Sequence, residues 1–220
     1  MALTIGCAHN EPASGVVEKG YHPLFNGKDL AGWTYAKTPE GKDMKNGQGY
    51  RIREDGVIYC TAEDGGRLFT EKEYSDFSLK FEFKLTQNAN NGIAIRSSDN
   101  GNPAYRGMEI QVLDDSGPKY HAPNKEIRPA QYHGSVYDIV PAKQGHQKPI
   151  GEWNDEEIIA NGRHIKVILN GATIVDTNLD DVKDEAILAK HPGIKYPSGH
   201  IGLLGHGAAL EFRNFRIKEL

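Results

Sequence analysis

The sequence predicts an all-β protein, a two-sheet antiparallel sandwich with one short surface helix. The 25 glycines and 11 prolines among 220 residues indicate many turns with short segments between them. Residues 76–86 alternate apolar and polar side chains over five consecutive pairs, which predicts a strand with one buried and one solvated face. Many such short segments without an internal repeat are typical of a β-sandwich or jelly roll.

Two hairpins are predicted from their turn residues. Asp55-Gly56 separates residues 50–53 from 57–60, and Asn170-Gly171 joins residues 163–169 to 173–176. Both dipeptides tolerate the positive φ angles of tight hairpin turns. Further strands are expected over residues 92–96, 107–113, 133–138, 156–159, 200–204 and 209–218.

The last strand needs an irregularity, and one segment reads as a helix. Leu210 and Phe212 have the opposite parity to Phe215 and Ile217, so a β-bulge near Arg213-Asn214 is required to keep all four in the core. Residues 181–190 begin with acidic side chains and carry apolar ones at helical spacing, which predicts the short surface helix.

Charge and hydropathy exclude some classes of function. The net charge is −4, and basic residues are interspersed with acidic ones, so the basic stripe that nucleic-acid binding requires is missing. No run approaches the roughly 18 consecutive apolar residues of a membrane-spanning helix. A neutral or mildly polar ligand is therefore expected.

The two cysteines are too few for a disulfide framework and lack metal-ligand spacing. Cys60 is expected in the core. Residues 3–7, which end at Cys7, resemble the end of a bacterial lipoprotein signal, and a polar stretch follows. We expect residues 1–20 to be a flexible tether and residues 21–220 to be a single domain. The chain would then be exported, either periplasmic or anchored to the bacterial envelope by a lipid on Cys7. The alternative is an ordinary unstructured N-terminus.

The strand over residues 107–113 carries unusual polarity. Alternation places Glu109 and Gln111 on one face and Met108, Ile110 and Val112 on the other, which must be the core. Glu109 and Gln111 then form either a ligand site or a simply solvated outer face. Asp114 has the opposite parity and lies roughly 16 Å from Glu109 along an extended strand. Glycosidase carboxyls lie about 5 to 9.5 Å apart, so these two acids are not such a pair.

Other polar residues accompany this strand as weaker candidates. Arg96 shares its parity with two small residues and is either a ligand clamp or a surface ion pair. His133 lies in another predicted strand, and His206 closes a segment with four glycines that must approach another backbone or a ligand. Trp153 is either a sugar-stacking platform or a loop anchor.

Several motifs in order along the chain carry a resemblance. They are residues 24–30, Gly32-Trp33, Asn91-Gly92 followed by Arg96, residues 106–114, residues 151–154, Gly205-His206-Gly207 and residues 211–214. Together they resemble the bacterial 3-keto-disaccharide hydrolase family, over nearly the whole predicted domain. The resemblance implies a concanavalin-like jelly roll, an exported protein and action on glycosides oxidised to a ketone at C3.

The implied substrate requires one base instead of two matched carboxylates, because a C3 ketone acidifies the C2 hydrogen and permits β-elimination of the C1 substituent. We assign proton transfer to Glu109 and His133, with His206 as the alternate acid. Contacts to the sugar or its oxyanion are expected from Asn91, Arg96, Gln111 and Trp153. A divalent metal on Glu109 and His133 could replace Arg96 as the electrophile. The alternatives are a non-catalytic carbohydrate-binding sandwich or a structural domain.

Overall fold

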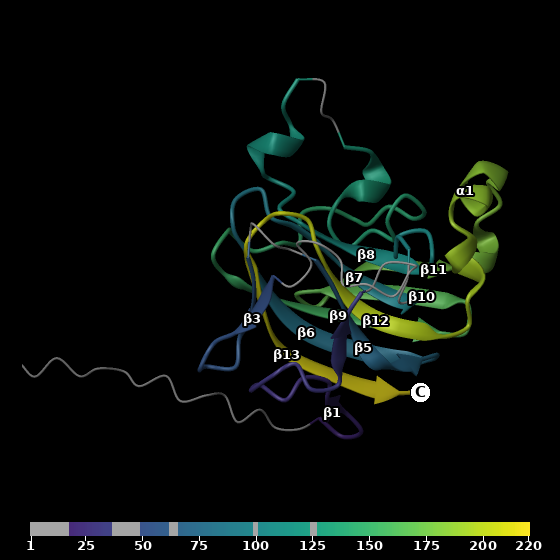
Figure 1. Ribbon diagram of the computed structural model, residues 1–220. Coiled ribbons are helices and arrows are strands. Elements are labelled where there is room, and N and C mark those ends of the chain that lie inside the picture. Colours follow the sequence, from purple (N-terminus) through teal and green to yellow (C-terminus); the bar gives the residue numbers. More distant parts are fainter. Residues whose placement is uncertain (1–17, 37–48, 62–65, 99–100, 124–126) are drawn as a thin grey trace, which may run out of the picture.

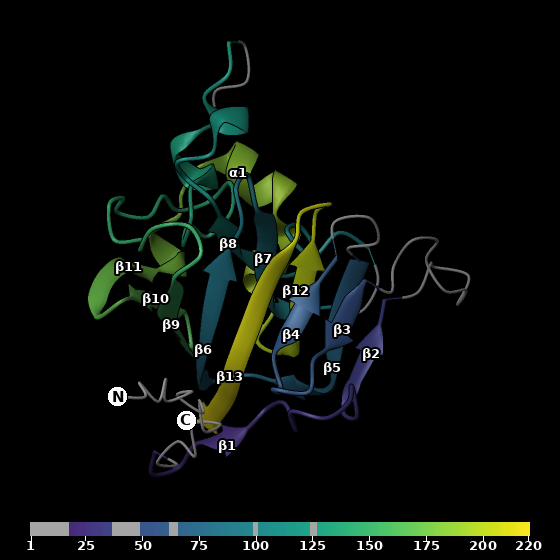
Figure 2. The ribbon, with the colours of Figure 1, turned by 90° about the vertical axis from the view of Figure 1, so that its left-hand side faces the viewer.

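Two antiparallel β-sheets packed face to face form the protein (Figures 1 and 2). This computed structural model describes residues 18–36, 49–61, 66–98, 101–123 and 127–220. The predicted all-β sandwich is confirmed. The predicted lipid attachment at Cys7 and most of the predicted tether lie outside the described residues. Within the described ranges, no helix has the length and apolar character needed to cross a bilayer.

The larger sheet has eight strands in the order β11-β10-β9-β6-β13-β4-β3, with β1 also paired to β13. Their bounds are β1 His22–Pro23, β3 Tyr50–Ile52, β4 Ile58–Cys60, β6 Phe77–Leu85, β9 Trp153–Asn161, β10 His164–Leu169, β11 Ala172–Asn178 and β13 Leu210–Glu219. Both predicted hairpins are confirmed, since β3 pairs with β4 and β10 with β11. Asn170 and Gly171 have φ of 50° and 84°, as the tight turn requires.

The smaller sheet has five strands in the order β2-β5-β12-β7-β8. Their bounds are β2 Trp33–Tyr35, β5 Gly66–Tyr74, β7 Asn90–Ser97, β8 Met108–Leu113 and β12 Gly199–Gly205. Residues 134–137 run beside β8, because Gly134 N donates to Gln111 O and Tyr137 N donates to Glu109 O. This segment is not the regular strand predicted over 133–138, since Asp138 turns out of it with a φ of 60°.

The core fills the space between the sheets. Phe77, Leu79, Phe81 and Phe83 of β6 are fully buried, as the alternation predicted. Phe81 stacks on Phe215 at a centroid distance of 5.0 Å. The predicted bulge is confirmed, because the register of β13 against β6 shifts between Arg213 and Arg216. Cys60 is buried in this core, and burial raises the pKa of its thiol to about 11.

The helix is shorter than predicted. It spans α1 Glu185–Lys190, is capped by the Asp184 carboxylate and buries none of its side chains. Short 3-10 turns lie over Pro118–Tyr120, Pro129–Gln131, Leu179–Asp181 and Pro192–Lys195. The turn at Leu179–Asp181 takes up the start of the predicted helix, because Leu179 is buried and anchors that segment to the core.

Strand β5 did not stand out in the sequence because both of its faces are apolar near its start. Leu68 belongs to the main core, whereas Phe69 packs on the outer face with Ala36, Ala94 and Leu204. A Cβ atom on Gly202 would lie 2.5 Å from the Phe69 ring, so this ring lies directly on the β12 backbone. Period-two alternation is lost in a strand that is covered on both sides.

Candidate active site

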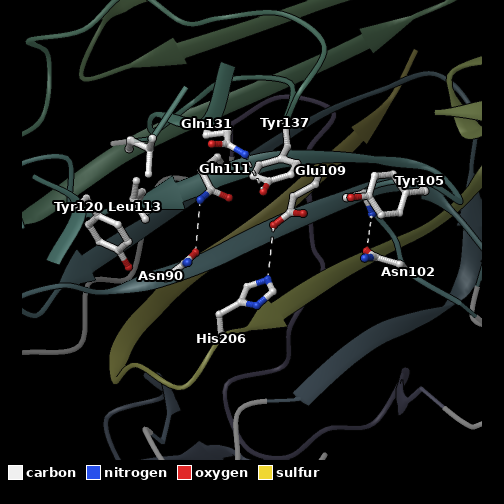
Figure 3. A pocket seen from close by; sticks show the side chains of 12 residues that line it. Asn90, Asn102, Tyr105, Glu109, Gln111, Leu113, Tyr120, Gln131, Tyr137 and His206 are labelled. Carbon is white, nitrogen blue, oxygen red and sulfur yellow. Dashed lines mark hydrogen bonds and ion pairs between the residues drawn. The ribbon is translucent and has the colours of Figure 1, made fainter. Parts of the chain in front are cut away.

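An open pocket of roughly 230 Å³ lies on the outer face of the smaller sheet, along β8 (Figure 3). Strands β7 and β8 supply its floor, and the connections around them supply its walls. The described lining residues are Asn90, Asn102, Ala104, Tyr105, Glu109, Gln111, Leu113, Tyr120, Ile127, Gln131, Tyr137 and His206. The predicted polar face of β8 is therefore neither core nor open surface, because the walls cover it.

Glu109 is the acidic group of this floor. Its side chain is 6% exposed, and Oε1 has no hydrogen-bond partner among the described residues. His206, which follows β12, places Nε2 3.8 Å from that oxygen (Figure 3). This separation is too long for a direct hydrogen bond and leaves a buried acceptor without a partner at the lining of the pocket.

Space for the Glu109 carboxylate comes from Gly92 on the neighbouring strand. A Cβ atom at residue 92 would lie 2.1 Å from Oε1 and 2.7 Å from Cγ of Glu109. The absence of a side chain at Gly92 therefore makes room for the acid itself. On the other side of β8, Tyr137 N donates to the backbone oxygen of Glu109 at 2.8 Å, which fixes the edge of the strand.

Amide and phenol groups surround the carboxylate. Gln111 Nε2 donates to Asn90 Oδ1 at 3.3 Å, and Gln131 Nε2 donates to the Tyr137 hydroxyl at 3.0 Å. Burial raises the pKa of Tyr137, and the negative charges of Asp138 and Glu109 raise it further. The Tyr137 hydroxyl therefore keeps its proton at neutral pH and can donate it in a hydrogen bond.

Comparison with known proteins identifies the family. The family model for the 3-keto-alpha-glucoside-1,2-lyase-like domain matches residues 20–218. The chain belongs to this family. It is 27% identical over 235 residues to a 3-keto-disaccharide hydrolase of Bacteroides thetaiotaomicron, and the match covers 91% of this chain and 79% of that protein.

Solved structures agree with this assignment. A glycosyl hydrolase candidate from Parabacteroides distasonis superposes with a TM-score of 0.76 at 26% identity, covering 91% of this chain and 94% of that one. A Bacillus subtilis protein of unknown function with a galectin-like fold superposes with a TM-score of 0.57 at 13% identity, covering 90% and 94%. The second likeness concerns the fold alone and supports the predicted jelly-roll architecture.

Within this family member, His133 does not lie in the pocket. Its ring lies between the sheets, 4.9 Å from the Phe83 ring, with Nε2 3.0 Å from Glu156 Oε2. Its Nδ1 accepts from Leu113 N at 3.3 Å, so the ring proton lies on Nε2. His133 is thus on the opposite side of β8 from Glu109, and the predicted catalytic or metal-binding pair of these residues is not formed.

Arg96 is also elsewhere. Its φ of 47° breaks the strand alternation and turns the side chain inward, where it is 1% exposed. The guanidinium donates to Ser75 O at 2.8 Å, Gly162 O at 2.7 Å and Asp76 Oδ1 at 2.9 Å, which ties the connection from β5 to β6 to the hairpin turn between β9 and β10. It is not the predicted ligand clamp; the ion pair that was the alternative is present with the partly exposed Asp76, but the guanidinium that makes it is buried. Arg67 of β5 is a cation whose charge interacts with Glu109.

Asn91 and Trp153 are outside the pocket as well. Asn91 is fully buried, donates to the Tyr50 hydroxyl at 3.1 Å and accepts from Leu204 N at 3.1 Å, so it links the two sheets. Trp153 pairs with Lys84 on the outer face of the larger sheet, with Arg213 Cζ 4.0 Å and Lys84 Nζ 4.9 Å from its ring centroid. Its cation contacts agree with an anchoring role instead of a sugar platform beside Glu109.

The pocket does not fit a bound catalytic metal. Among the described lining residues, Glu109 and His206 are the only carboxylate and imidazole, whereas catalytic zinc uses three protein ligands. No group of three or more histidine, cysteine, aspartate or glutamate side chains with ligating geometry occurs in the described part of the chain. Proton transfer by the side chains themselves is the chemistry that this arrangement supports.

Of the residues that line the pocket, the sequence predicts a functional role for Glu109, Gln111 and His206, but for none of the tyrosines. Tyr105, Tyr120 and Tyr137 all come from irregular connections around β8. Strand periodicity gives no information in such irregular connections. The sequence signal that could have indicated these residues is the accumulation of tyrosine and amide residues around a polar strand.

Proposed function

We propose that this chain cleaves 3-keto-glycosides, including 3-keto-disaccharides, with Glu109 as the base that removes the C2 proton. The observation that carries the proposal is the buried Glu109 Oε1, which lacks a hydrogen-bond partner among the described residues and faces His206 Nε2 at 3.8 Å across the pocket. Membership of the family and the likeness to a 3-keto-disaccharide hydrolase support the substrate class.

The acid content of the pocket favours a keto-sugar over an ordinary glycoside. Among the described lining residues, Glu109 is the only carboxylic acid. Retaining and inverting glycosidases both need two carboxyl groups flanking the scissile bond. Asp114 is unavailable, because its carboxylate accepts from Asn88 N at 2.7 Å and from Ser116 Oγ at 2.7 Å. A single base suffices where a ketone acidifies the adjacent carbon.

The proposed reaction proceeds in two steps. Glu109 takes the C2 proton, the C2 electrons form an enolate with the C3 ketone, and the enolate expels the C1 oxygen to leave a C1–C2 double bond. His206 delivers a proton to the departing oxygen. Water then adds, with hydroxide at C1 and the proton returned to C2, so that the net reaction is hydrolysis. Release before water addition would make the enzyme a lyase.

Two neutral donors are placed to stabilise the enolate oxygen. The Tyr137 hydroxyl accepts a hydrogen bond from Gln131 and can direct its own proton into the pocket. The Gln111 side chain projects from the same strand as Glu109 and is 4% exposed. Preorganised donors of this kind act more strongly in a water-poor site than in solution.

The test is turnover of a 3-keto-glucoside in heavy water by the wild type and by Glu109→Gln. We expect product with deuterium at C2 from the wild type, and a loss of about 10² to 10⁴ in kcat for the variant with substrate binding retained. Activity in the presence of a chelator is expected to persist. Product without deuterium would overturn the elimination. Binding without turnover by the wild type would favour the carbohydrate-binding alternative.

A further inference from the structure

The two ends of the pocket differ in how open they are. At one end Tyr120 is 7% exposed and Leu113 is 1% exposed. The Tyr120 hydroxyl donates to Asn88 O at 3.1 Å, which fixes this end. At the other end Asn102 is exposed and Tyr105 is half-buried. A closed end accepts a terminal unit only, so the remainder of a longer ligand must extend toward Tyr105.

The ring of Tyr105 is supported by the residues that end helix α1. The His191 ring lies 5.0 Å from it, and the Lys190 ammonium lies 5.6 Å from its centroid. His191 is fully buried, and its Nδ1 contacts Ala104 O at 2.8 Å, so Nδ1 carries the proton and donates it. Burial lowers the pKa of His191, which keeps this support neutral.

The backbone that carries Tyr105 is also held rigidly. Gly193 N donates to Tyr105 O at 2.9 Å. A Cβ atom on Gly193 would lie 2.0 Å from Gly107 N, and one on Gly107 would lie 2.6 Å from Ser97 Cα. The backbones of three chain segments are therefore in close contact at the turn that carries Tyr105. A ring fixed in this way loses little conformational entropy when a ligand packs on it.

We propose that Tyr105 is the platform of a leaving-group subsite that binds the second pyranose ring of the substrate, an inference that rests on the proposed function. The 3-keto unit occupies the closed end beside Glu109 and Gln111, and the departing sugar packs its apolar face on Tyr105. The described lining residues include no lysine or arginine, and the Lys190 ammonium beside Tyr105 is paired with Asp138 at 2.7 Å, so the described part of the subsite suits a neutral sugar. Tyr105 thus has the sugar-stacking role that the sequence suggested for Trp153.

The experiment compares two substrates that share the 3-keto-glucosyl unit and differ in the leaving group, glucose or methanol. Tyr105→Ala should lower kcat/KM for the disaccharide about tenfold, mainly through KM, because an aromatic contact contributes up to about that factor. The loss for the methyl glycoside should be much smaller, and thermal unfolding shows separately that the variant is folded. Tyr105→Phe keeps the ring and should behave as the wild type with both substrates.

Trp153→Ala is the matched control, since it removes an aromatic ring from the opposite sheet. It should change kcat/KM for neither substrate. Equal losses for both substrates in Tyr105→Ala would overturn the subsite, as would a Tyr105→Phe variant as impaired as Tyr105→Ala. A wild type that turns over neither substrate would contradict the proposed function instead. In that case, NMR titration with the unoxidised disaccharide and the unoxidised methyl glycoside tests the subsite. The subsite requires the disaccharide to bind more tightly than the methyl glycoside, and Tyr105→Ala should remove this difference.

Discussion

The Glu109 carboxylate occupies the space that a side chain at Gly92 would need, with Oε1 2.1 Å from the position of a Cβ atom there. Gly92 does not have a positive φ, so its backbone conformation is open to any residue. The requirement for glycine at this position comes from the neighbouring acid and therefore from the site, not from the fold.

Gly92→Ala should separate activity from stability. The atoms that must move belong to the flexible Glu109 side chain, so we expect the free energy of unfolding to stay within about 1 kcal/mol of the wild type. Displacing the base should lower kcat/KM by about 10². Urea unfolding and turnover of a 3-keto-glucoside measure the two quantities. Full activity in this variant would show that the observed Glu109 position is not the working one.

Strand β8 shows how far sequence reasoning reaches. Alternation placed Met108, Ile110 and Val112 in the core and Glu109 and Gln111 on the other face, and the structure confirms both placements. The burial of Glu109 could not be predicted, because the walls that cover it come from segments distant in sequence with no periodic pattern. Local periodicity specifies the face of a strand, and tertiary packing decides what covers that face.

The irregular strands β13 and β7 show the same limit of prediction from local sequence. The bulge at Arg213-Asn214 could be predicted, because apolar residues lie on both sides of it and their parity changes. The positive φ at Arg96 left no such trace, because Ser97 beyond it is polar and buried. Its three hydrogen-bond acceptors lie in turns that sequence cannot bring together, so Arg96 was wrongly placed on the ligand side.

Tyr137→Phe tests the proposed oxyanion donor. Removing one such donor typically costs about 10² in kcat, and that loss is expected here with little change in stability. Because the pKa of Tyr137 is raised above its usual value of 10.0, the wild type should show no alkaline loss from this group below about pH 10. Tyr59→Phe on the opposite sheet is the control. An unchanged kcat in Tyr137→Phe would assign the donor role to Gln111.

The His133 and Glu156 pair should prove structural. Glu156 is fully buried, and neither of its carboxylate oxygens makes a hydrogen bond in the described structure, although His133 Nε2 lies 3.0 Å away. Replacing this buried, unpartnered acid by the amide of the same shape should not destabilise the fold, so Glu156→Gln should be at least as stable as the wild type. His133→Ala leaves the carboxylate alone and should cost about 3–5 kcal/mol. Chemical denaturation measures both.

Activity decides whether His133 has a second role. Both variants should retain the wild-type pH profile of kcat under conditions in which they are folded, because the pair lies on the far side of β8 from Glu109. A folded Glu156→Gln protein with a shifted pH profile would restore His133 as a catalytic candidate.

Asp138 should contribute stability in a pH-dependent way. Burial raises the pKa of its carboxyl, but hydrogen bonds and positive charge from Lys190 at 2.7 Å and Arg128 at 2.6 Å outweigh burial, so the net shift is downward. A folded-state pKa below the unfolded value means that the carboxylate form stabilises the fold. The contribution is complete above about pH 4 and is lost as the pH falls through the folded pKa.

Asp138→Asn isolates this charge, because asparagine also tolerates the φ of 60° at this position. Both cationic partners are largely exposed, so the variant should lose at most about 1 kcal/mol at pH 7, and less at high salt. Urea unfolding at pH 7 and pH 2.5 measures the difference, which should shrink at the lower pH. A difference that persists unchanged at pH 2.5 would mean that Asp138 acts through its hydrogen-bond geometry and not through its charge.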